Sequence, residues 1–117
     1  MQVLFESRDP QAASLRDLAV QRLQLVLRRL RLLVSRARLR LSDINGPRGG
    51  VDKRCQVELA TDSAGTLVIS ATARDWRSAI DNALSRAARL LLRQGRRERA
   101  TARQAGRGTR QAQALEP

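Results

Sequence analysis

The sequence predicts an α+β fold, a two-layer β-α-β-β-β-α sandwich in which a four-stranded mixed sheet carries two helices on one face. Three observations support this prediction. Several short segments alternate apolar and polar residues with the period of a half-buried strand. Two longer segments repeat apolar residues at the spacing of an amphipathic helix. The length, 117 residues, suits one small domain.

The chain is expected to begin with a strand and a crossover helix. The strand covers residues 2–7, and the helix runs from about residue 12 to residue 34, with either Asp9 or Ser14 as its N-cap. Because a helix returns the chain, the first strand is expected to lie parallel to the strand that it joins. The predicted buried stripe of this helix consists of Leu15, Ala19, Leu23, Val26, Leu30 and Leu33, widened by Leu18, Leu25 and Leu32.

Three strands are predicted next, at 35–44, 53–61 and 66–73, and the last two form a hairpin. Short connections make these strands antiparallel neighbours. Strict alternation in the first of them turns one set of side chains inward, so the arginines between them face the open side of the sheet. The inward residues are Ala37, Leu39 and Leu41, then Cys55, Val57 and Leu59, then Leu67, Ile69 and Ala71; the outward arginines are Arg36, Arg38 and Arg40.

A second helix, capped by Asp75, is predicted from about residue 76 to residue 97. Its buried stripe comprises Trp76, Ile80, Ala83, Leu84, Ala87 and Leu91. The sequence after it is rich in arginine, alanine and glutamine and has little to bury, which is typical of disorder. We therefore expect a folded domain over residues 1–98 and a disordered tail over residues 99–117.

The net charge of +12 comes almost entirely from arginine, since Lys53 is the one lysine. So large a surplus favours a polyanionic partner, with nucleic acid first and an anionic membrane surface second. The most apolar segment, residues 23–34, contains three arginines and does not suit a membrane span. The N-terminal residues are too polar for a signal peptide, so we expect a cytoplasmic protein.

Enzymatic activity is not expected, because the chain has no histidine, no tyrosine and a single cysteine. A zinc site of cysteine and histidine and an internal disulfide are both excluded. Cys55 lies in a strand pattern and lacks a histidine to activate it, so it is expected to be a buried apolar residue. No metal, cofactor or small-molecule substrate is predicted.

The segment DINGPRGGVDKRC, residues 43–55, has the glycines of a phosphate-binding loop. However, a P-loop needs a different glycine spacing and a helix after it, and here a strand follows. The segment is therefore interpreted as a flexible connection between strands. Its basic residues are expected to make secondary contacts to a polyanion; they are Arg48, Lys53 and Arg54.

Both predicted helices carry arginines opposite their apolar stripes. Acidic residues at i±4 do not balance these arginines, so they repel one another, and their planar guanidinium groups suit phosphate. The main predicted contacts are Arg22, Arg28 and Arg29 on the first helix and Arg86, Arg89, Arg93, Arg96 and Arg97 on the second. The two aromatic residues, Phe5 and Trp76, fall at buried positions, so binding is expected through phosphates and shape, without base stacking.

The order of elements and several motifs resemble the short form of the ribosome hibernation promoting factors, also called ribosome-associated inhibitor or sigma-54 modulation proteins. The match spans about residues 1–98. It is best over GTLVISATARDWRSAIDNALSRAARLLLRQGRR, residues 65–97, where an acidic cap precedes an aromatic residue, an Ala-Ile-Asp step and a basic helix end. SLRDLAVQRLQLVLRRL and NGPRGGVDKRC are also similar to segments of this family.

The resemblance implies a stress-response protein that binds 16S rRNA in the mRNA and tRNA channel of the small ribosomal subunit and inhibits translation. It implies contacts through the basic helix residues named above, and a monomer on the ribosome. The alternative is a generic RNA-binding or RNA-chaperone module that acts away from the ribosome.

Overall fold

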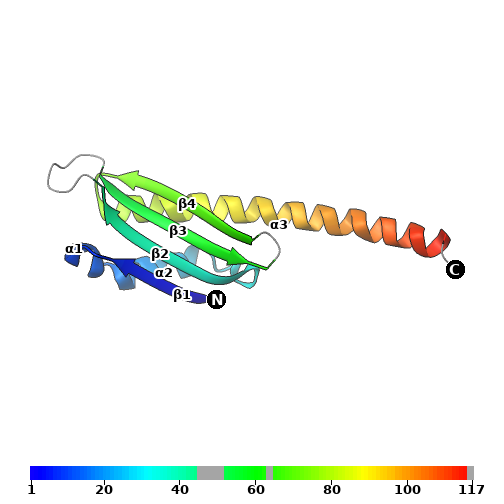
Figure 1. Ribbon diagram of the computed structural model, residues 1–117, viewed down its shortest axis with the longest axis horizontal. Helices are drawn as coiled ribbons and strands as arrows, with labels where there is room; N and C mark the ends of the chain where they lie inside the picture. Colours follow the sequence, from blue (N-terminus) through cyan, green and yellow to red (C-terminus); the bar gives the residue numbers. More distant parts are fainter. Residues whose placement is uncertain (45–51, 63–64, 116–117) are drawn as a thin grey trace.

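The computed structural model describes residues 1–44, 52–62 and 65–115, and side chains as far as Arg97. A four-stranded sheet carries all the described helices on one face (Figure 1). The elements in chain order are β1 (Gln2–Ser7), α1 (Pro10–Ala13), α2 (Arg16–Val26), the 3-10 turn η1 (Arg31–Leu33), β2 (Val34–Asp43), β3 (Lys53–Thr61), β4 (Gly65–Ala73) and α3 (Trp76–Leu115).

The sheet has the strand order β1-β2-β3-β4. β1 pairs with β2 in parallel, and the other two pairs are antiparallel. This arrangement confirms the predicted mixed sheet, the parallel first strand and the β3–β4 hairpin. The other face of the sheet is open, as expected for two layers.

The core lies between the sheet and the helix layer, and the period-two alternation predicted its sheet side correctly. On β2 and β3 the inward side chains Leu39, Val57 and Leu59 are fully buried. The entire predicted stripe of α3, from Trp76 to Leu91, is buried as well. α3 packs over β3 and β4 through this stripe, and α2 lies beside it over β1.

Aspartates cap the N-termini of α1 and α3. Asp9 accepts the backbone N–H of Gln11 at 2.9 Å, so the cap is Asp9 and not Ser14. Asp75 accepts the backbone N–H of Ser78 at 2.9 Å and its hydroxyl at 2.8 Å. These two hydrogen bonds stabilise the carboxylate and lower the pKa of Asp75.

The single helix predicted over residues 12–34 is wrong. α2 ends at Val26, and the chain turns through η1 before β2 begins at Val34. The reason is geometric: β1 is six residues long, a span of about 20 Å that a helix covers in about 13 residues. The chain must then leave the helix layer to reach the start of β2.

This early end of α2 also changes which apolar residues are buried. Leu27 is fully buried in place of Val26, which is 39% exposed. Leu25 and Leu32, which were expected to widen the stripe, are 64% and 90% exposed. Three large apolar side chains at the end of the first helical region therefore face outward.

The predicted end of the last helix near residue 97 is also wrong, because α3 continues to Leu115 (Figure 1). Alanine, arginine and glutamine are good helix formers, and glycines at 106 and 108 are the weak positions in this segment. The division into a folded domain, residues 1–98, and a disordered tail stays a prediction.

Leu84→Ala is expected to lower the free energy of unfolding by about 2–5 kcal/mol, because Leu84 is fully buried in the core. The same change at the exposed Leu32 is expected to cost less than about 0.5 kcal/mol. Urea denaturation of both variants measures the difference. Equal losses would contradict the packing of α3 described above.

Asp75→Ala is expected to destabilise the protein in a pH-dependent way. Because the folded-state pKa of Asp75 is lowered, the cap contributes stability above the unfolded pKa of about 3.9 and loses it as the pH falls through the folded pKa. The gap in melting temperature between wild type and variant should therefore be widest near pH 6 and narrow in acid. The gap in melting temperature between Asp75→Asn and Asp75→Ala should show no such narrowing, because neither of these side chains titrates.

Candidate nucleic-acid interface

The exposed side of α3 carries five arginines within twelve residues, at positions 86, 89, 93, 96 and 97. Steps of three and four residues place them on one side of the helix. This side lies opposite the buried stripe that packs on the sheet, so burial of that stripe forces the arginines outward. All five side chains are exposed, as predicted.

Arg28 and Arg29, also exposed, follow the end of α2 beside α3. They border the same notch as Ala88 and Leu92 of α3, so the structure brings the two helices' basic residues onto one surface. We call this surface the helix-layer arginine face; it comprises Arg28, Arg29, Arg86, Arg89, Arg93, Arg96 and Arg97.

The helix-layer arginine face is not neutralised within the described part of the chain. Residues 82–97 include no acidic residue, and none of the seven arginines has a carboxylate within ion-pair distance among the described side chains. Two make hydrogen bonds to backbone carbonyls: Arg86 to Ser70 on the edge strand β4 at 3.2 Å, and Arg89 to Ser85 at 3.4 Å. The positive charge therefore stays available to an external anion.

Arg22 differs from the other predicted helix contacts. Its guanidinium donates to Asp81 at 2.7 Å and joins α2 to α3. The side chains are 39% and 44% exposed, so this ion pair adds little stability, although it fixes the orientation of Arg22. A contact from Arg22 to nucleic acid stays a prediction.

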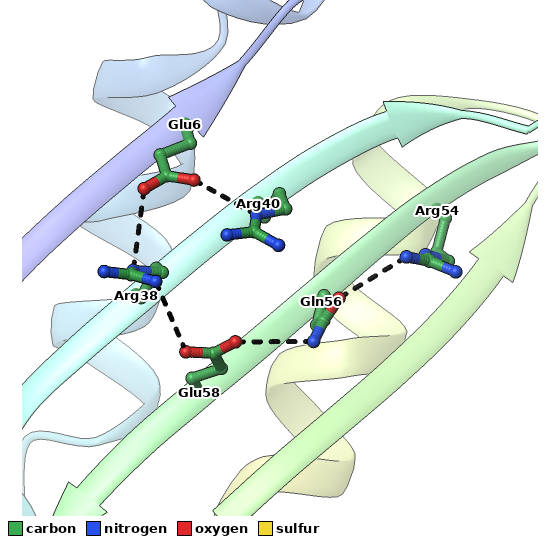
Figure 2. Close-up of polar contacts among 6 residues, drawn as sticks. All are labelled: Glu6, Arg38, Arg40, Arg54, Gln56 and Glu58. Carbon is green, nitrogen blue, oxygen red and sulfur yellow. Dashed lines mark hydrogen bonds and ion pairs between the residues drawn. The ribbon is translucent and has the colours of Figure 1, made fainter.

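The open face of the sheet carries a network of arginines paired with carboxylates (Figure 2). Glu6 lies between Arg38, at 3.6 Å, and Arg40, at 3.1 Å. Arg38 also lies 3.8 Å from Glu58, and Glu58 accepts a hydrogen bond from the side-chain amide of Gln56 at 3.5 Å. The structure confirms that these arginines face outward. Their carboxylate partners were not predicted, because they come from β1 and β3 and depend on the register between the strands.

Lys53 and Arg54, at the start of β3, do not join the helix-layer arginine face. Lys53 points toward the helix side and lies 2.7 Å from Asp43, 3.5 Å from Asp52 and 5.3 Å from the centroid of the Trp76 ring. The hydrogen bond to Asp43 raises the pKa of Lys53. Arg54 lies on the opposite face of the sheet, where its guanidinium donates a hydrogen bond to the side-chain oxygen of Gln56 at 3.4 Å (Figure 2). Arg48 lies outside the described residues.

Cys55 is fully buried on β3, and burial raises the pKa of its thiol to about 12. A thiol with this pKa is protonated at neutral pH and is a poor nucleophile. Among the described residues no three histidine, cysteine or carboxylate side chains gather in a way that would hold a metal ion. No helix in that part of the chain is both long and apolar enough to cross a membrane.

Sequence reasoning missed one feature of this surface, the apolar residues between its two groups of arginines. Leu25, Val26 and Leu92 are exposed there. The helical spacing of Leu25 and Val26 predicted burial. Their exposure follows from the position where α2 ends, which depends on the length of β1.

No protein-family model matches the chain, and no curated protein sequence matches it. Several solved structures have a similar fold, and they include the following two. A ribosomal subunit interface protein from Coxiella burnetii aligns with a TM-score of 0.63 at 17% identity, over 81% of this chain and 98% of that one. The N-terminal domain of Thermus thermophilus Protein Y aligns with a TM-score of 0.58 at 20% identity, over 80% and 98%. At these identities the likeness shows the shared fold.

The helix-layer arginine face is expected to determine the salt dependence of binding to single-stranded RNA. Arg89→Gln combined with Arg93→Gln removes two cations, so the slope of log K against log salt should become shallower by about 1.4. The matched control is Arg16→Gln combined with Arg74→Gln, which changes the net charge by the same amount at exposed sites outside this face. Filter-binding titrations at several salt concentrations test this, and equal slopes for the two double variants would contradict it.

Proposed function

We propose that this protein binds 16S rRNA in the small ribosomal subunit, occupies the channel used by mRNA and tRNA, and thereby inhibits translation. The observation that carries the proposal is the helix-layer arginine face, which presents seven exposed guanidinium groups without carboxylate partners among the described side chains. Guanidinium groups match phosphate geometry, and an RNA backbone supplies phosphates at the density that such a face requires.

The fold supports the ribosome as the source of that RNA. Solved structures with a similar fold include a ribosomal subunit interface protein and a Protein Y domain. Each is aligned over nearly its whole length, 98%, so the comparison involves the complete two-layer fold, including the helices that carry the arginines.

The proposed action is non-catalytic. The protein acts as a monomer on the ribosome, by occupying space and neutralising phosphates, in the cytoplasm and under conditions that favour idle ribosomes. Residues 1–98 contain the whole arginine face and are proposed to suffice for binding. Arg22, Arg48, Lys53 and Arg54 are proposed as secondary contacts.

Co-sedimentation with purified small subunits at low salt tests this function. The wild-type protein should pellet with the subunits, and mRNA or tRNA should compete with it. Arg89→Glu combined with Arg93→Glu should abolish pelleting, because two phosphate contacts become repulsions. Arg16→Glu with Arg74→Glu, a matched change in charge elsewhere, should pellet nearly as well as wild type.

Two results would count against the proposal. A protein that stays in the supernatant with excess small subunits at low salt is not a ribosome-binding factor. Equal affinity for a plain RNA duplex and for small subunits would favour a generic RNA-binding or chaperone module that acts away from the ribosome.

A further inference from the structure

A small apolar notch interrupts the helix-layer arginine face. It lies between the end of α2 and the middle of α3 and has a volume of about 350 Å³. Leu25, Val26 and Leu92 line it and are 64%, 39% and 39% exposed, and Arg28 and Arg29 form its charged rim. Single exposed apolar residues are common on protein surfaces, but these gather around one concavity.

The size of the notch limits what it can accept. On α3 its lining is Ala88 and Leu92, which are one helical turn apart, so the notch extends about 6 Å along that helix. An amphipathic helix in a groove needs anchors over two or more turns, which this length does not provide. A volume near the lower end of small-molecule pockets, about 300 Å³, suits one planar ring.

The charges around the notch determine which chemical groups the ligand should carry outside it. Its charged lining residues, Arg28 and Arg29, are both cationic, and the α3 arginines continue the positive surface beyond Leu92. A second copy of this chain, docked on the same face by two-fold symmetry, would bring arginines against arginines. The ligand should therefore have an apolar group that enters the notch and an anionic group on either side of that group.

An unpaired nucleobase in an RNA strand has this combination. Its planar ring has two apolar faces, and phosphates lie on either side of it along the strand. Exposed guanidinium groups can hold those phosphates and also stack on the ring, while aliphatic side chains cover the remaining face.

We propose that the notch between α2 and α3 binds one unstacked base of the RNA whose phosphates contact the helix-layer arginine face. This inference rests on the proposed RNA-binding function and gives it a contact to a base. It also replaces the sequence-based expectation that base stacking is absent, because aliphatic and guanidinium groups take the place of aromatic side chains.

The test uses the full chain and two matched double variants. Leu25→Ser with Leu92→Ser removes the apolar lining, whereas Leu32→Ser with Val68→Ser changes two exposed apolar residues outside the notch. The probes are a single-stranded oligoribonucleotide and an oligomer of the same length in which every base is absent. Affinities are measured over a range of salt and extrapolated to 1 M, where phosphate contacts contribute least.

The notch variant should bind the normal strand about fivefold more weakly at every salt concentration, at the lower end of base-stacking effects. The slope of log K against log salt should be the same for the notch variant and for wild type. The two proteins should also bind the abasic strand with equal affinity. The control variant should behave as wild type with both probes. Circular dichroism melts should show that both variants are folded.

Three outcomes would overturn the inference. They are an unchanged affinity for the normal strand, an equal loss for the abasic strand, and a notch variant that loses self-association or binding to anionic vesicles instead of RNA binding. The first of these, with wild-type affinity for small subunits retained, leaves the proposed function intact. Failure of the wild-type protein to bind small subunits contradicts the proposed function itself.

Discussion

The packing of α3 on the sheet is the interaction on which the rest of the molecule depends. Ile80, Leu84 and Leu91 are buried against β3 and β4, and a helix with one buried stripe must present the opposite side to solvent. From Arg86 to Arg97, every third or fourth residue on that side is arginine. The hydrophobic core therefore holds a rigid row of guanidinium groups at fixed helical spacing, which a flexible basic tail would not provide.

Arginines on the two faces of the molecule differ in whether they have carboxylate partners. On the open sheet face, Arg38 and Arg40 lie beside Glu6 and Glu58 in one network. On the helix layer, Arg22 is the one arginine that pairs with a carboxylate among the described side chains, through Asp81. A positive surface without internal partners repels itself, so its charge favours association with a polyanion more than it favours folding.

Local patterns predicted most of the fold. Alternation in β2 and β3 identified the inward residues correctly, and the cap at Asp75 together with the stripe of α3 predicted that helix from its start. The arginines at 86–97 followed from the same stripe, because the helical period fixes both sides of a helix at once. For these elements local and tertiary preferences agree.

The remaining features depend on distances that no local pattern contains. Residues 12–34 have helical spacing throughout, yet the length of β1 ends α2 at Val26 and leaves Leu25 and Leu32 exposed. The apolar notch exists because of that turn. Likewise, the pairing of Glu6 with two arginines depends on the parallel register of β1 and β2, which only the folded sheet establishes.

The helix layer holds its positive charge at a cost to its own stability. Arg93 has like-charged neighbours at 89, 96 and 97, and each such pair destabilises a helix by about 0.2–0.5 kcal/mol at low salt. The most direct test is the free energy of unfolding of Arg93→Gln, measured at low and at high salt. The variant should be more stable than wild type by about 1 kcal/mol at low salt, and this gain should disappear at high salt. A variant that is equally or less stable than wild type at low salt would contradict it.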